Sequence, residues 1–374
     1  MKKMSKLLAL LLSLLLICMA FTACGGGSGE SEPAGGAEGG EATVELDEDA
    51  LAAALEEMDE VKINWAISMG SSHRVNEVFN YFSDTIKERT NGKVIITNYP
   101  GDTLVTSNSI YDSLIQGVID MGEADPAYSV AAFPMISSYF LPGMNYDNSV
   151  VATHVANDLF TESGLDELSN AHYLFAYGMT PSIIFGNKKV ESLADFNGMQ
   201  IRATGYAIPV VEGLGAAAVG ITPAETYEAL MKGTADAALM PAEALMNWNF
   251  AEVSKYATKI TGFSTSMHYI AINQDVWNSL PPPVQALFEE VADECVEKVA
   301  PMWDNMAEEG YAFAEEKNTE IIEMSAENLA ECMTALEPVR AKWVEDNAKY
   351  GDSQAVLDYV DGLVEKYNAE YGNK

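Results

Sequence analysis

One arginine in this chain stands where a guanidinium could bind an anion. The 374-residue sequence has four arginines, and Arg74, Arg89 and Arg340 lie in helix-like segments with polar or charged neighbours. Arg202 instead lies in the apolar, strand-like residues 199–203, which run into a glycine-containing loop. A planar guanidinium pairs bidentately with a carboxylate. We therefore predict that Arg202 binds the carboxylate of a ligand. An ion pair with an acidic side chain of this acidic chain is the open alternative.

Other groups that could do chemistry lack the required spacing. His73, His154, His172 and His268 include no pair four residues apart, so we predict no metal site. No Gly-x-Ser-x-Gly motif is present. Because this motif forms the turn that carries the nucleophilic serine of many hydrolases, the sequence gives no support for a serine hydrolase. Residues 213–218 match the residue pattern of a dinucleotide-binding fingerprint. That fingerprint follows a strand and opens a helix, whereas these residues follow a helical segment and lead into a strand. The sequence predicts no catalytic residues and no cofactor, hence not an enzyme.

Charge limits the class of partner. The chain carries 56 acidic and 21 basic residues, a formal net charge of -35. Such an acidic surface disfavours binding of nucleic acid and of anionic lipid headgroups. We therefore predict no nucleic-acid partner. A small anion stays compatible, because exposed charges more than about 8 Å away are largely screened at physiological salt. Cys295 and Cys332 fit either a disulfide or two buried thiols.

The N-terminal residues are typical of an export signal. Lysines precede the apolar residues 7–20, a run too short to span a bilayer but suited to a signal. The run leads into Phe-Thr-Ala-Cys, ending at Cys24, and three glycines follow. This pattern resembles a bacterial lipobox, although Phe21 stands where leucine is usual. We predict lipidation of Cys24; an ordinary secretory signal is the alternative.

These features set the expected placement of the chain. We predict a lipoprotein signal peptide at residues 1–24 and a flexible, acidic and glycine-rich tether at residues 25–60. Residues 44–60 could also contain a short helix. The folded part would then be lipid-anchored at the extracytoplasmic face of the bacterial cell membrane, in the periplasm or at the cell surface.

The order of predicted elements indicates an α/β protein with two domains. Residues 61–122 read strand, helix, strand, helix, strand, an order that implies a parallel sheet. The same order restarts near residue 183 and continues to residue 240. A long helical stretch follows at residues 284–318, with more helices after it. Two such units leave a cleft between them, the usual place for a small-molecule site.

Several segments resemble those of one known family, in the same order and spacing. They are residues 62–66, 90–94, 99–101, 116–122, 192–202, 225–230, 241–245, 251–253 and 255–256, together with His73, Gly233 and Asp236. The family is the solute-binding proteins of tripartite ATP-independent periplasmic (TRAP) transporters, DctP type. The resemblance covers the chain from about residue 61 to its end.

The resemblance implies a periplasmic-binding-protein-like fold. Its two α/β domains enclose a ligand cleft, and a long helix spans both. We place the first domain at residues 61–180 plus 268–305 and the second at residues 181–267 plus 306–374. The resemblance also implies that the arginine at position 202 binds a carboxylate. The function it implies is capture of a small organic acid and delivery to two membrane subunits, one small and one large.

The departures from the family pattern bear on the ligand. Ser182 stands where many members carry a further polar or basic contact, and Leu239-Met240 replaces Glu-Asn. A less polar pocket favours a single carboxylate on an apolar or aromatic body. The predicted ligand-binding residues are Arg202, Ser71, Ser72, Asp125, Tyr128, Tyr177, Ser182, Tyr206, Met240 and Trp248. The aromatic members of this set could equally be packing residues.

Two other classes of function stay open. A sensory protein could present the same ligand to a membrane receptor on the same fold. An enzyme on a related scaffold would need a nucleophile–base pair or a metal cluster, and the sequence offers neither.

Overall fold

The computed structural model describes residues 46–373. The predicted signal peptide, Cys24 and the tether up to residue 45 lie outside the described residues and stay predictions. No helix in the described range is long and apolar enough to cross a membrane. Cys295 and Cys332 are both free and buried, which decides between the two alternatives for these thiols.

The first sheet has the strand order β2-β1-β3-β10-β4. Its strands are β1 (Val61–Ile67), β2 (Val94–Pro100), β3 (Met121–Ala124), β4 (Ala171–Gly178) and β10 (Met267–Asn273). β1 pairs in parallel with β2 and β3, as the βαβαβ pattern predicted, whereas β10 is antiparallel to β3 and β4. The helices of this part are α2 (Asn76–Arg89), α3 (Ile110–Ile115), α4 (Ser149–Thr161) and α8 (Gln274–Ser279). All seven residues of β10 are buried, as expected for a central strand covered on both faces.

The second sheet has the order β11-β9-β5-β8-β6-β7. Its strands are β5 (Ser182–Gly186), β6 (Gln200–Arg202), β7 (Ala217–Val219), β8 (Ala237–Pro241), β9 (Tyr256–Lys259) and β11 (Glu320–Glu323). β6 pairs in parallel with both β7 and β8. The accompanying helices are α5 (Ile208–Gly213), α6 (Pro223–Lys232) and α7 (Ala244–Asn247). The start of α6 is set locally, because Thr222 and Glu225 form a capping box around Pro223.

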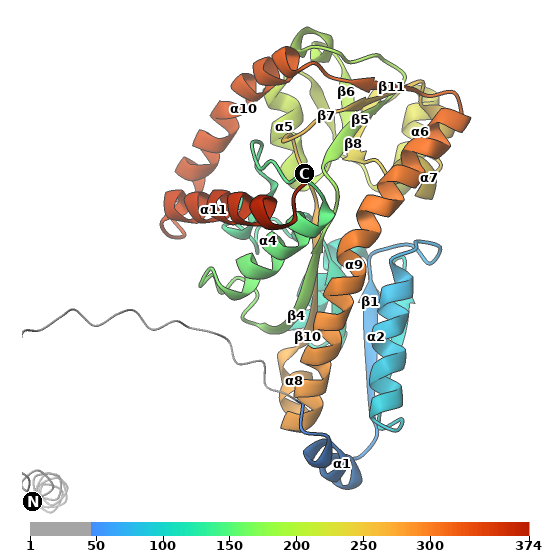
Figure 1. Cartoon of the computed structure of the whole chain (residues 1–374), viewed down its shortest axis with the longest axis vertical. Coiled ribbons are helices and arrows are strands. Elements are labelled where there is room, and N and C mark those ends of the chain that lie inside the picture. Colours follow the sequence, from blue (N-terminus) through green and yellow to red (C-terminus); the bar gives the residue numbers. More distant parts are fainter. Residues whose placement is uncertain (1–45, 374) are drawn as a thin grey trace, which may run out of the picture. The chain divides into compact units, whose positions relative to one another are not determined.

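The chain passes between the two sheets more than once. β4 continues almost directly into β5, and β9 returns to the first sheet through β10 (Figure 1). Short 3₁₀ turns complete the connections: Ser107–Ser109, Pro126–Tyr128, Ile136–Phe140, Leu193–Phe196, Gly205–Ala207 and Phe250–Val253. The predicted fold class, a two-domain α/β fold with a helix across both domains, is confirmed.

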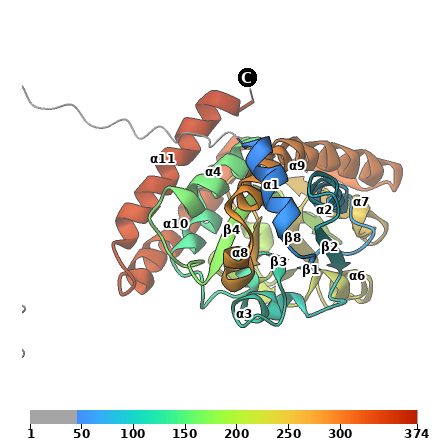
Figure 2. The same cartoon turned by 90° about the horizontal axis from the view of Figure 1, so that it is seen from below.

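Helix α9 (Pro282–Glu316) connects the two halves. Its 35 residues extend over roughly 50 Å at about 1.5 Å per residue. It packs against α2 and β4 of the first sheet and against α7 and β11 of the second (Figure 1). Figure 2 shows it running along one side of the molecule. Trp303 and Met306 of α9 belong to the same buried cluster as Trp65 of β1, so α9 is core as well as connector.

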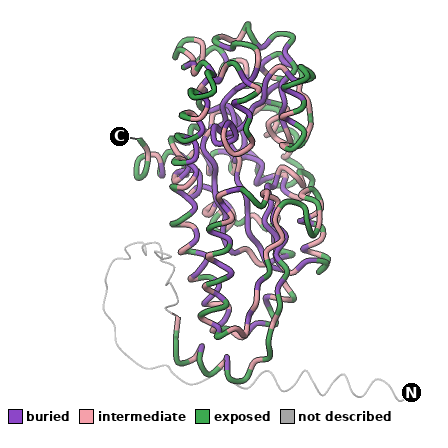
Figure 3. Tube along the Cα trace, turned by 90° about the vertical axis from the view of Figure 1, so that its right-hand side faces the viewer, coloured by how far each residue is buried: buried purple, intermediate pink, exposed green. Residues whose placement is uncertain are grey.

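Buried residues run along the strands and the inner faces of the helices, with exposed residues outside (Figure 3). Helix α1 (Glu48–Glu57) belongs to this packed body, so of the two alternatives for residues 44–60 the structure shows the short helix and not more tether. Asp47 caps the helix by accepting hydrogen bonds from the backbone N–H groups of Asp49 and Ala50. Leu51 and Leu55, one turn apart, are buried in the same hydrophobic cluster as Trp65, and this burial stabilises the helix.

The last helices depart from the predicted domain limits. Helix α10 (Ala326–Asn347) packs on α5 of the second sheet. Helix α11 (Ser353–Tyr371), expected in the second domain, lies on α4 of the first sheet instead. Its apolar residues Leu357, Val360 and Val364 are buried there. No local signal in α11 distinguishes one domain from the other, because either offers an apolar surface. The remaining domain limits stay a prediction.

Gly310 tests how α9 docks on the second half. A Cβ at this position would lie 2.3 Å from the carbonyl oxygen of Ala242, so only glycine lets α9 approach. We expect Gly310→Ala to lower the free energy of unfolding by about 1–3 kcal/mol through overpacking. This loss should appear although alanine favours a helix interior by about 1 kcal/mol. Gly362→Ala in α11, where no atom lies within 4 Å, is the matched control and should be neutral or stabilising. Urea titration of both variants measures the difference; equal stabilities would contradict the proposed docking.

Candidate ligand-binding site

A cavity of about 630 Å³ lies between the two sheets. Its walls come from the carboxyl ends of parallel strands: β1 and β3 on one side, β6, β7 and β8 on the other. Loops at these ends meet at the edge of each sheet, which is where α/β proteins place ligands. The predicted cleft is therefore present in the structure.

Seven of the ten predicted ligand-binding residues line this cavity. They are Arg202, Asp125, Tyr128, Ser182, Tyr206, Met240 and Trp248. The first sheet contributes Asp125 and Tyr128, and the second half contributes the other five. The structure thus brings together side chains that are more than 120 residues apart in the sequence.

Arg202 ends β6 and is buried, with 4% of its surface exposed. Its Nε donates a hydrogen bond to the backbone oxygen of Ile221, 3.1 Å away. No ion pair between Arg202 and a carboxylate is formed within residues 46–373, so the internal salt bridge that the sequence left open is not found there. Burial lowers the pKa of Arg202 to about 10, against the opposing attraction of Tyr128 and Asp125, and the group stays protonated at neutral pH. A buried cation of this kind is costly unless an anion compensates it.

Asp125 faces Arg202 from the first half. It caps the turn Pro126–Tyr128, with Oδ1 accepting a 2.7 Å hydrogen bond from the Ala127 N–H. Burial raises the pKa of Asp125 to about 6, although the nearby His268 and the hydrogen bond from Ala127 oppose the shift. At neutral pH the carboxyl group is therefore mostly ionised.

A buried ion pair lies behind this wall. Glu123 is fully buried, and its Oε1 lies 2.5 Å from Nδ1 of His268. Burial alone would raise the pKa of Glu123, but His268 and hydrogen bonds from Tyr177 and Ser68 lower it. Burial likewise opposes the charge on His268, but Glu123 outweighs it and raises the pKa of the imidazole. The pair is therefore charged, and it holds the floor of the cavity in place.

Three predicted residues do not line the cavity. Tyr177 is fully buried between the rings of His268 and Trp303, at 5.3 and 5.5 Å, and its hydroxyl donates to Glu123. Ser71 and Ser72 are exposed in the turn that follows β1. They lie outside the lining because the backbone turns back at Gly70, whose oxygen accepts from the His73 N–H.

The lining also contains Ser68 and Met69, which belong to the same predicted candidate loop after β1 as Ser71 and Ser72. His268 and Glu243, which the prediction missed, contribute further titratable groups. From the sequence, His268 was considered only as a possible metal ligand. It is a titratable side chain within the apolar strand β10. Arg202 was selected because it has the same feature, so searching all apolar segments for titratable side chains would also have found His268.

The two walls touch beside the cavity. Gly205 of the second half lies against Ala127 of the first, so close that a Cβ on Gly205 would be 2.6 Å from Cβ of Ala127. The hydroxyl of Tyr206 donates to the backbone oxygen of Phe133 at 3.1 Å. The cleft is therefore closed in this structure.

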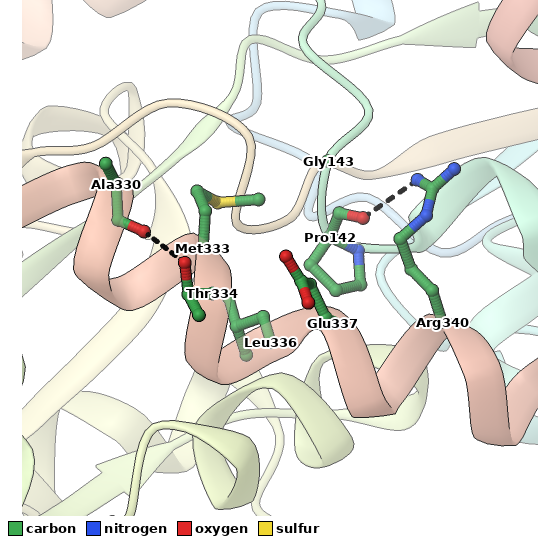
Figure 4. A pocket seen from close by; sticks show the side chains of 8 residues that line it. All are labelled: Pro142, Gly143, Ala330, Met333, Thr334, Leu336, Glu337 and Arg340. Atoms are coloured by element: carbon green, nitrogen blue, oxygen red, sulfur yellow. Dashed lines mark hydrogen bonds between the residues drawn. The ribbon is translucent and has the colours of Figure 1, made fainter.

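A second, smaller cavity of about 330 Å³ lies between α10 and the loop at Pro142 (Figure 4). Its cation, Arg340, donates to the oxygen of Pro142 and pairs with Asp361 at 2.5 Å. This guanidinium already has a carboxylate partner. The smaller cavity is therefore a poorer anion-binding site than the cavity lined by Arg202.

A two-domain α/β fold closed over a cavity with a buried arginine defines a solute-binding protein. This chain belongs to the bacterial extracellular solute-binding proteins of family 7, DctP, whose model matches residues 66–347. The predicted resemblance to TRAP solute-binding proteins is thereby confirmed.

Individual relatives agree with this assignment. A TRAP periplasmic solute-binding protein of Desulfovibrio salexigens is 28% identical, with a TM-score of 0.75 over 84% of this chain and 98% of its own. A TRAP solute-binding protein of Rhodoferax ferrireducens, in complex with copurified benzoate, is 21% identical, with a TM-score of 0.77 over 83% of this chain and 99% of its own. A monocarboxylate 2-oxoacid-binding periplasmic protein of a Nostoc species is 21% identical over 304 residues, which are 76% of this chain and 78% of that protein.

The buried pair should dominate the stability of the first half. We expect Glu123→Ala to cost about 3–5 kcal/mol of unfolding free energy, because it removes the nearer counter-ion of His268 and leaves only Asp125, 3.9 Å from Nε2. Glu309→Ala is the matched control, since it removes an exposed ion pair with Arg74 and should cost no more than about 1 kcal/mol. Denaturant titration measures both, and similar losses would contradict a charged, buried pair.

The same pair predicts a pH dependence. Because the pKa of His268 is raised in the folded protein, its contribution is fully present below the ordinary histidine value of 6.5 and is lost as the pH rises through the raised pKa. Glu123 has the opposite sign: its contribution is lost only as the pH falls through its lowered pKa. We expect stability to fall above neutral pH in the wild type and to fall less in His268→Gln. Melting temperatures measured from pH 6 to pH 9 compare the two; parallel curves would count against the charged imidazole.

Proposed function

We propose that this protein captures a small organic monocarboxylate outside the cytoplasm and delivers it to the membrane subunits of a TRAP transporter. The observation that carries the proposal is Arg202. Its guanidinium is buried at the cavity wall, stays protonated, and has no carboxylate partner within residues 46–373. A ligand carboxylate would supply the missing charge and accept two parallel N–H groups.

The rest of the lining favours an apolar or aromatic ligand body. Phe140, Met179, Tyr206, Met240 and Trp248 all face the cavity, and Ser182 is a small polar neighbour. Aromatic and sulfur-containing side chains pack well against a ring. The copurified benzoate of the Rhodoferax protein and the 2-oxoacid in the name of the Nostoc protein are both monocarboxylates, which supports this ligand class.

Delivery and anchoring complete the proposal. The family, which consists of extracellular solute-binding proteins, supports a transport role. We propose that the partners are the small and the large membrane subunit of a TRAP transporter. We propose that the export signal at residues 1–24 is removed and that a lipid on Cys24 holds the protein at the membrane. We propose no catalytic step: the Glu123–His268 pair stabilises the cavity, and binding ends in release to the transporter.

A binding panel with an arginine variant tests the proposal. A ligand at a hundred times its dissociation constant adds about 2.7 kcal/mol to stability, which raises the melting temperature by several degrees. We expect at least one aromatic or aliphatic monocarboxylate to do this for the wild type and not for Arg202→Gln. Arg74→Gln is the matched control, because Arg74 pairs with Glu309 on the surface. If neutral solutes shift the melt and no acid does, or if Arg202→Gln binds acids normally, the proposal is wrong.

A further inference from the structure

The cavity lining contains more acidic than cationic side chains, and this imbalance restricts how many carboxylates a ligand can carry. Within the described part of the chain, Arg202 and His268 are the cationic groups of the lining, and Asp102, Asp125 and Glu243 are the acidic ones. His268 is already paired with Glu123 behind the wall. Arg202 therefore provides charge for one ligand carboxylate, and a second carboxylate would meet acidic side chains.

Asp125 has hydrogen-bonding capacity that the protein does not use up. Oδ1 accepts from the Ala127 N–H, whereas Oδ2 lies 3.9 Å from Nε2 of His268, beyond hydrogen-bond distance. The Ser266 side chain also hydrogen-bonds to Asp125 and favours its ionised form. A carboxylate has about four acceptor positions, so these contacts leave room for another donor. The side chain is 8% exposed, and Asp125 lines the cavity.

The placement of Asp125 allows a bound ligand to donate a hydrogen bond to its carboxylate. Asp125 follows β3 in the first half and Arg202 ends β6 in the second, and both side chains line the same cavity. A ligand whose carboxylate lies on Arg202 would occupy the space between them. Its neighbouring atoms would then face Oδ2 of Asp125.

We infer that Asp125 is a specificity-determining residue that selects monocarboxylates carrying a hydroxyl or ammonium group near the carboxylate and rejects dicarboxylates. This inference rests on the proposed capture of a carboxylate by Arg202. Capping of the turn Pro126–Tyr128 explains only the Oδ1 contact of Asp125. A hydrogen bond from a ligand to the charged Oδ2 is worth about 10- to 100-fold in affinity.

Four acids with the same ring test the inference on the purified full chain. Phenylacetate has the carboxylate alone, mandelate adds a hydroxyl, phenylglycine adds an ammonium and phenylmalonate adds a second carboxylate. Calorimetric titration at pH 8, where Asp125 is ionised, gives the four affinities. We expect mandelate and phenylglycine to bind about 10- to 100-fold more tightly than phenylacetate, and phenylmalonate to bind more weakly than phenylacetate.

Asp125→Asn provides the decisive comparison. Its amide oxygen can keep the bond from Ala127, which turns the NH₂ group toward the ligand and replaces an acceptor with a donor. We expect phenylglycine to lose its advantage and phenylmalonate to gain affinity, whereas phenylacetate should bind about as before and so show that the site is intact. Asp358→Asn is the matched control: Asp358 of α11 is an exposed carboxylate outside the cavity that accepts from Gln354, and its loss should leave the order of affinities unchanged.

The outcomes separate the inference from the function on which it rests. If the four acids bind equally well, or if Asp125→Asn keeps the wild-type order, the role of Asp125 is wrong while acid capture stands. If none of these acids and no acid of the melting panel binds the wild type, the proposed function fails and the inference with it.

Discussion

The site depends on one constraint: a charge buried between two sheets needs a compensating partner. The structure meets this constraint in two ways. His268 is compensated inside the protein by Glu123, which also accepts hydrogen bonds from Tyr177 and Ser68. Arg202 has only a backbone oxygen as its partner among the described residues. Because the desolvation of a guanidinium is costly, this arrangement favours binding of an anion from solution.

The architecture explains why these charges meet. Arg202 and Asp125 each lie at the carboxyl end of a strand, in different sheets, and the closed cleft brings the two ends together. The contact of Gly205 with Ala127 leaves no space for a side chain between the walls. Helix α9 lies against both halves, and Gly310 permits its close approach to the second. Small backbone positions thus control how the walls meet, while Arg202 and Asp125 line the space between them.

Rigidity and selectivity share the same residues. The rings of His268, Tyr177 and Trp303 form a stack that ties β10 and β4 to α9. This stack positions His268, which in turn neighbours Asp125 at the cavity wall. The first wall is therefore preorganised, and this preorganisation reduces the entropy that a ligand would otherwise lose on ordering the site.

The sequence alone determined many of the elements and the type of chemistry, whereas strands β4, β9, β10 and β11 and helices α4 and α8 were not predicted. The apolar periodicities, the proline-initiated helix α9 and the parallel βαβαβ order are local properties, and they identified the fold class. An arginine in an apolar strand was visible in the same way, and so was most of the lining, because strand ends are readable. Tertiary structure alone decided which side chains reach the cavity. Tyr177 turned out to support Glu123, Ser71 and Ser72 turned outward, and His268 joined the wall, since orientation within a strand or turn depends on what packs against it. It also placed α1 and α11 on the first half, because an amphipathic helix specifies that it must be covered but not by which surface.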